Sequence, residues 1–144
     1  MATVVLLSVS DTDEREFGSE IARACARAGV QTEFTGDKAR SDPAFIVWSP
    51  EGSVDDFSVY PALRAVFSLW AGVERVVDNP TLSAPLCRMV DPGLTQGMVE
   101  YVLAHVLRYH LDLDSRLTSQ DGVWRNAPLP RLAPGRRVGV LGLG

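Results

Sequence analysis

The chain has 144 residues, of which 46% are hydrophobic and 22% are charged, and its formal net charge is -4. This length accommodates one ordinary domain with a buried core, and the composition is that of a soluble globular protein. Because nucleic-acid-binding domains usually present a basic face, the acidic balance argues against a nucleic-acid partner.

Strand and helix patterns alternate through the first part of the chain. Residues 3–9 form a continuous run of mostly β-branched residues and leucines, typical of a strand buried on both faces of a parallel sheet. A helix follows, with Asp11 as its expected N-cap, Glu14 as the second member of a capping box and Gly29 at its end. Further strands are predicted at residues 30–35, 44–48, 63–68 and 86–90. The alternation predicts an α/β fold with a flavodoxin-like, doubly wound parallel sheet.

The pattern changes to a long helix over residues 95–117, where apolar side chains recur at helical spacing around a wide face. This face is too wide for one small domain to cover, so we expect it to meet a second domain or another subunit. His105 and His110 lie five residues apart and do not share a face of that helix. With no acidic or cysteine cluster beside them, both are expected to be structural, and no metal site is predicted.

The two cysteines and the N-terminus give little sign of chemistry or of targeting. Cys25 lies in a helical pattern and Cys87 in an apolar strand pattern, so both are expected to be buried as small hydrophobic residues. The N-terminus has no basic region, and its apolar run is too short to cross a bilayer. We therefore expect a cytoplasmic protein without a membrane partner.

The C-terminal residues 118–144 combine a connector with an apolar strand, expected at residues 137–141, that runs into two glycines. Gly142 and Gly144 match the first two glycines of the G-x-G-x-x-G fingerprint. In that motif the first glycine permits a tight turn and the second lets the backbone approach a pyrophosphate. A plain turn at the end of a strand is the alternative interpretation.

Three segments resemble the D-isomer-specific 2-hydroxyacid dehydrogenases, in particular their glyoxylate/hydroxypyruvate reductase A type. The segments are LRAVFSLWAGVERVV, RMVDPGLTQGMVEYVLAHVL and WRNAPLPRLAPGRRVGVLGLG, in that order along the chain. The resemblance implies a substrate domain at residues 1–94, an interdomain and dimerisation helix at 95–117, and the start of an NAD(P)-binding domain at 118–144. Family members are about twice as long, so the chain is expected to be a fragment, inactive alone, whose catalytic arginine, histidine and acid lie beyond its last residue.

The resemblance also assigns roles to individual residues. The backbone amides of Ala71 and Gly72 would hold the substrate carboxylate, as a turn with free N–H groups can; a turn that needs glycine only for its backbone conformation is the alternative. Trp48 would line the substrate pocket, or else pack in the core. Met98 would lie against the nicotinamide, or else be an ordinary apolar helix residue, and Gly142 and Gly144 would bind the coenzyme. Trp70 stands where the family generally carries a small residue.

The function implied is the reduction of a small 2-oxoacid, such as glyoxylate or hydroxypyruvate, with NAD or NADP as the hydride donor. A homodimer formed through the long helix is expected. The alternative is a stand-alone flavodoxin-like binding or interaction module, in which the final glycines have no role.

Overall fold

The structure is a computed structural model that describes residues 2–126, 129 and 131–142. The chain divides into two compact units, Met1–Val90 and Asp91–Gly144. No helix among the described residues is long and apolar enough to span a bilayer.

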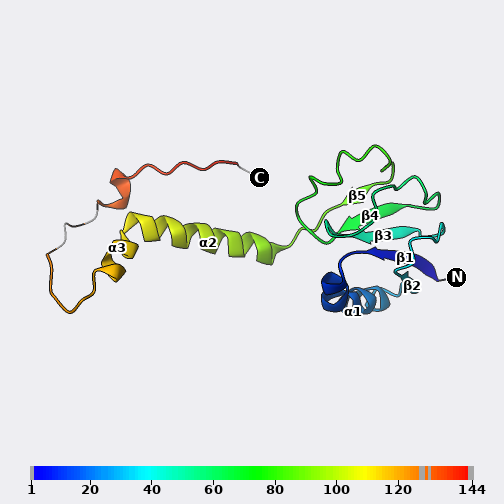
Figure 1. The fold of residues 1–144 in the computed structure, drawn as a ribbon, viewed down its shortest axis with the longest axis horizontal. Helices are drawn as coiled ribbons and strands as arrows, with labels where there is room; N and C mark the ends of the chain where they lie inside the picture. The colour runs from blue at the N-terminus through cyan, green and yellow to red at the C-terminus, as the bar shows by residue number, and fades with distance from the viewer. Residues whose placement is uncertain (1, 127–128, 130, 143–144) are drawn as a thin grey trace. The chain divides into compact units, whose positions relative to one another are not determined.

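The first unit is built on a five-stranded sheet with the order β2-β1-β3-β4-β5, and every adjacent pair is parallel (Figure 1). This is the flavodoxin-like order, so the predicted fold class is confirmed. The strands are β1 Thr3–Ser8, β2 Thr32–Thr35, β3 Phe45–Trp48, β4 Ala65–Ser68 and β5 Leu86–Cys87.

Alternate residues of the strands contribute side chains to two apolar clusters, one on each face of the sheet. Val5, Leu7 and Val47 pack on one face with Ile21 of helix α1 (Asp11–Arg27). The strand residues of the other cluster are covered by side chains from turns, and its buried members are Leu6, Ile46, Trp48, Val54, Phe57, Tyr60, Val66 and Val76. Among the described residues of this unit, turns replace the helix that a fully doubly wound sheet would carry on that second face.

Helix α1 begins one residue earlier than the capping pattern predicted. The N-cap is Ser10, whose hydroxyl accepts a hydrogen bond from the Asp13 amide at 3.1 Å, so the predicted Asp11–Glu14 capping box is wrong. Glu14 is exposed. The predicted end of the helix is confirmed, because Gly29 takes φ +72° there, a conformation that favours glycine.

The second unit contains helix α2 (Pro92–His110) and the short helix α3 (Leu113–Thr118), where the sequence predicted one continuous helix. The break falls at Asp112, whose φ of +52° is incompatible with a continuous right-handed helix. Helix α2 starts at Pro92 because Asp91 caps it, accepting a hydrogen bond from the Leu94 amide at 3.2 Å. No residue of α2 is buried.

Residues 131–142 contain a short 3-10 helix, Ala133–Gly135, and otherwise no regular structure. The strand predicted at residues 137–141 is therefore wrong for this structure, since no described strand pairs with that segment. Gly142 has φ +87°, as a glycine in a tight turn can. Gly144 lies outside the described residues.

Candidate functional site

Buried serines mark the carboxyl ends of three neighbouring strands. Ser8 ends β1 with 1% exposure, Ser49 follows β3 with none, and Ser68 ends β4 with 5%. Ligands of open parallel sheets bind at this edge of the sheet. Each serine is hydrogen-bonded to a neighbouring loop or helix.

The segment after β4 turns away from the sheet in two steps. The Leu69 amide still donates to the Trp48 carbonyl at 3.0 Å, which extends the β3–β4 ladder by one residue. At Trp70 the ladder stops, because the Ser68 hydroxyl takes up both backbone groups of that residue. It donates to the Trp70 carbonyl at 2.9 Å and accepts from the Trp70 amide at 3.2 Å.

The amides that follow have no protein partner. Within the described part of the chain, none of the backbone N–H groups of residues 71–75 donates a hydrogen bond, and the next to do so are those of Val76 and Val77, which donate to the Val73 carbonyl. Gly72 is exposed and Ala71 is half-buried. Consecutive unbonded N–H groups at an exposed turn can bind an anion such as a carboxylate. We call residues Ser68–Gly72 the amide corner.

Gly72 is not explained by backbone conformation alone. Its φ does not lie in the left-handed region, where Gly29, Gly122 and Gly142 are found among the described glycines. A β-carbon built on Gly72 would lie 2.8 Å from Oε2 of Glu74, the end of a flexible side chain. Because glycine has no side chain, the space beside the Gly72 amide stays open. The Glu74 carboxylate is the group that lies next to this space.

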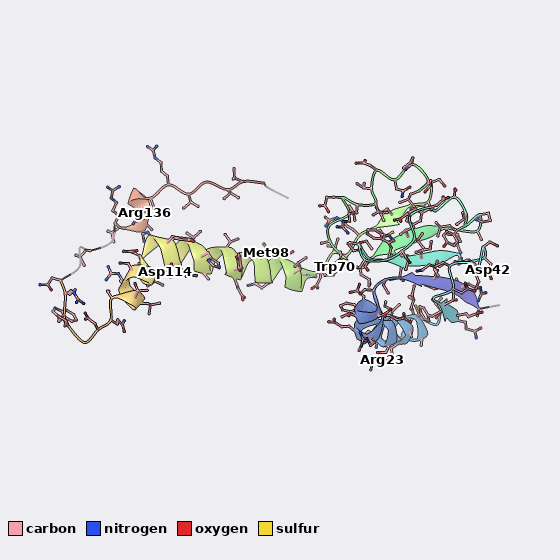
Figure 2. All side chains as sticks on the ribbon, viewed as in Figure 1. Arg23, Asp42, Trp70, Met98, Asp114 and Arg136 are labelled. Carbon is pink, nitrogen blue, oxygen red and sulfur yellow. The ribbon has the colours of Figure 1, made fainter. Side chains whose placement is uncertain are left out.

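The two tryptophans near the amide corner differ in their surroundings. Trp48 is buried, with 4% exposure, and its indole N–H donates to the Val54 carbonyl at 3.3 Å. This geometry favours the core alternative for Trp48, in register with Ser68 on the next strand. Trp70 is 48% exposed at the corner itself (Figure 2), and among the described residues its indole N–H has no partner.

A second set of contacts, not predicted from the sequence, ties the neighbouring turn to the sheet. The buried Asp13 carboxylate accepts a hydrogen bond from the Ser49 hydroxyl at 2.8 Å, and the Ser49 amide donates to the Ser8 carbonyl at 3.0 Å. Arg75 donates to the Pro50 carbonyl at 3.2 Å, which links the residues after the corner to the same turn. The recurrence of serine directly at the end of each buried strand is the sequence signal that could have found this network.

In the second unit, two residues predicted to bind a coenzyme line one groove. Met98, 54% exposed on α2 (Figure 2), and Gly142 bound a groove of about 810 Å³. Its other lining residues are Leu94, Thr95, Val99, Val102, Leu103, Val106 and Val140. A β-carbon on Gly142 would meet no atom within 4 Å, so the groove is open on that side.

The remaining candidates have structural surroundings. The His105 ring lies 4.4 Å from the Tyr101 ring, centroid to centroid, and the His110 carbonyl accepts a hydrogen bond from Arg136 at 3.2 Å. No group of three or more metal-ligating side chains occurs among the described residues. Cys25 is half-buried, but Cys87 is exposed, so the predicted burial of Cys87 is wrong. It belongs to the two-residue edge strand β5.

No protein-family model matches the chain, but two similar curated proteins have the same name. The glyoxylate/hydroxypyruvate reductase A of Serratia proteamaculans is 33% identical, with 90% of this chain and 42% of the relative aligned. The protein of the same name from Yersinia enterocolitica is 37% identical over 81% of this chain and 39% of its own length. The chain thus spans about two fifths of the length of these curated relatives.

Solved structures agree with these sequence matches. A D-isomer specific 2-hydroxyacid dehydrogenase from Xanthobacter autotrophicus Py2, in complex with NADPH and MES, superposes with a TM-score of 0.76 at 27% identity, over 100% of this chain and 47% of its own. The NADPH-dependent glyoxylate/hydroxypyruvate reductase of Sinorhizobium meliloti, in complex with NADP and sulfate, gives 0.61 at 27% identity, over 89% and 42%. Over most of its length the chain is thus similar to curated proteins named glyoxylate/hydroxypyruvate reductase A and to solved structures of D-isomer specific 2-hydroxyacid dehydrogenases.

Proposed function

We propose that the chain forms part of an NAD(P)H-dependent reductase and holds a small 2-oxoacid, such as glyoxylate or hydroxypyruvate, by its carboxylate. The observation that carries this proposal is the run of unbonded amides that begins at Ala71 and Gly72. The reductase names of the relatives support the substrate class. They also disfavour a stand-alone binding module, the alternative that the sequence left open.

In this proposal the amide corner binds and orients the substrate. The Ala71 and Gly72 N–H groups donate to the two carboxylate oxygens, and charge-assisted bonds of this kind are stronger than neutral ones. Trp70, half exposed at the same corner, shields one side of the ligand from water and offers a free N–H. Trp48 supports the corner from the core, because its carbonyl accepts a hydrogen bond from the Leu69 amide.

The residues proposed to hold the coenzyme are Met98, Gly142 and Gly144. The positive φ of Gly142 and the open space beside it fit the first glycine of a phosphate-binding turn, and Met98 lines the same groove. When bound, NADPH supplies the hydride that reduces the 2-oxo carbon. The part of this chain in that step is to keep an apolar surface against the coenzyme.

A titration with oxamate, an unreactive carboxylate analogue of glyoxylate, tests the substrate site. Amide proton–nitrogen correlation spectra of the chain should show the largest, saturable shifts at Ala71 and Gly72. Oxamide, which replaces the carboxylate by a neutral amide, is the matched control and should leave both signals in place. Oxamate shifts confined to surface arginines, or equal shifts with oxamide, would exclude the proposed carboxylate site.

Methyl spectra of methionine-labelled chain test the coenzyme surface. The chain has three methionines, so Met1 and Met89 serve as internal references for Met98. NADPH should move the Met98 methyl signal and leave that of Met89 unchanged. Equal movement of both signals would show nonspecific contact and contradict the assignment.

We also propose that α2 pairs with a second copy of the chain. All of its residues are exposed or half-buried, and the large apolar ones include Val102 at 49% and Leu103 at 56% exposure. Sedimentation of the wild type should therefore show a concentration-dependent dimer. Val102→Lys should sediment as a monomer and the control Glu100→Lys, at a position already charged, as the dimer. A wild type that stays monomeric at high concentration would refute the pairing.

A further inference from the structure

We infer that Ser68 is a positioning residue for the carboxylate-binding amides, an inference that rests on the function proposed above. The Ser68 side chain is 5% exposed and bonds both backbone groups of Trp70, donating to the carbonyl at 2.9 Å and accepting from the amide at 3.2 Å. One buried hydroxyl thus bonds both the N–H and the C=O of the residue that precedes the corner amides.

This arrangement decides where the chain leaves the sheet. The Leu69 amide is still paired with the Trp48 carbonyl, so the β3–β4 ladder reaches as far as Leu69. Backbone groups inside a protein need partners, and a strand that continued would find them on the next strand. A serine hydroxyl offers the backbone a local alternative to the ladder. With Trp70 satisfied by Ser68, the chain turns, and the amides of residues 71–75 emerge without protein partners.

The same arrangement leaves the Trp70 indole outside the fold. Its backbone is fixed by Ser68 while its side chain is 48% exposed. Ser68 therefore holds both parts of the proposed binding surface, the free amides and the aromatic side chain beside them. It does not contact the ligand in this proposal, so its effect is on the population of the binding-competent turn.

Ser8 is a matched control in the same sheet edge. It is 1% exposed at the end of β1, and its hydroxyl accepts a hydrogen bond from the Val54 amide at 3.0 Å. Ser8→Ala and Ser68→Ala thus each remove one buried hydroxyl that bonds a loop backbone. Only Ser68 bonds the residue next to the corner amides, so binding, rather than stability, separates the two variants.

Oxamate dissociation constants, measured from the Ala71 and Gly72 amide signals, give the test. If Ser68→Ala lowers the competent turn to about a tenth of the molecules, the apparent Kd rises about tenfold. Ser8→Ala should bind as the wild type does, and Ser68→Thr, which keeps the hydroxyl, should recover wild-type affinity. A thermal melt of each variant accompanies the titration, so that loss of fold is not read as loss of binding.

The outcomes distinguish failure of the positioning role of Ser68 from failure of the carboxylate site. Wild-type affinity in a folded Ser68→Ala would overturn the positioning role while leaving the carboxylate site intact. An equal loss of affinity in Ser8→Ala would show that Ser68 contributes only to general stability. This result would also overturn the positioning role. Absence of oxamate binding in the wild type would remove the proposed carboxylate site itself, and with it any role of Ser68 in positioning.

Discussion

Replacing Glu74 by glutamine should strengthen carboxylate binding at the amide corner. The Glu74 Oε2 atom lies 2.8 Å from the position of a β-carbon on Gly72, so its negative charge stands beside the proposed anion site. If a carboxylate bound to the Gly72 amide is taken to lie about 5 Å from it, the two unit charges in water repel by about 0.8 kcal/mol. Removing this repulsion improves Kd by a factor of about four before screening by salt.

Ionic strength provides the diagnostic for this repulsion. At about 0.01 M salt the Debye length of about 30 Å leaves an improvement of about threefold, and at about 1 M salt a Debye length of about 3 Å removes nearly all of it. The assay is the oxamate titration of Glu74→Gln and of the control Asp78→Asn, which changes the net charge equally from a nearby exposed position. An equal gain in both variants, or a gain that salt does not reduce, would refute the reasoning.

Further predictions concern stability and thiol chemistry. Ser49→Ala removes the hydroxyl that bonds the buried Asp13 carboxylate and should lower the unfolding free energy by about 1–3 kcal/mol in urea denaturation; unchanged stability would show that the bond contributes nothing. With a chromogenic disulfide reagent, the exposed Cys87 should react in a fast phase and the half-buried Cys25 in a slow one. Cys87→Ser should abolish the fast phase, and loss of the slow phase instead would contradict the exposures.

The fold was predictable because each strand has a recognisable local composition. Apolar runs bounded by glycine and proline predicted all five strands, although β5 proved to be only two residues long. The doubly wound arrangement followed from the alternation of strands and helices and not from any single segment. At the edge of the sheet, burial depends on neighbours, which is why the apolar pattern around Cys87 predicted burial that the structure does not have.

The errors fall where a tertiary contact or a single dihedral angle decides between local alternatives. Ser10 and Asp11 are adjacent and both are good N-caps; the structure uses Ser10, and the carboxylate of Asp13 in the same first turn bonds Ser49 across the sheet edge. The break at Asp112 interrupts an apolar periodicity that continues on both sides of it, so the pattern contains no sign of the break. Aspartate is one of the few residues that adopt a left-handed conformation readily.

The amide corner was predictable only in part. Ala71 and Gly72 came from a family motif, which names residues without showing which amides are free. Two properties of the corner depend on the three-dimensional structure. The amides of residues 71–75 lack protein partners, and the Ser68 hydroxyl forms hydrogen bonds with both backbone groups of Trp70. Serine at a strand end has many possible partners, so its residue type alone could not have shown this.

Gly72→Ala separates access to the amides from backbone conformation. Since Gly72 does not have a positive φ and its β-carbon would meet only the mobile end of Glu74, the substitution should leave the unfolding free energy within about 1 kcal/mol of wild type. Gly52→Ala is the contrast, because a β-carbon there would lie 1.9 Å from the Ser8 carbonyl oxygen, and we expect a loss of about 3 kcal/mol or more.

Binding should show the reverse dependence on Gly72. A methyl group beside the Gly72 amide occupies the space through which a carboxylate must approach, and the displaced Glu74 charge adds to the obstruction. We therefore expect Gly72→Ala to be stably folded, yet to bind oxamate at least about tenfold more weakly, a loss of about 1.4 kcal/mol. A folded Gly72→Ala variant with wild-type affinity would contradict this expectation. It would mean that the carboxylate does not approach the Gly72 amide.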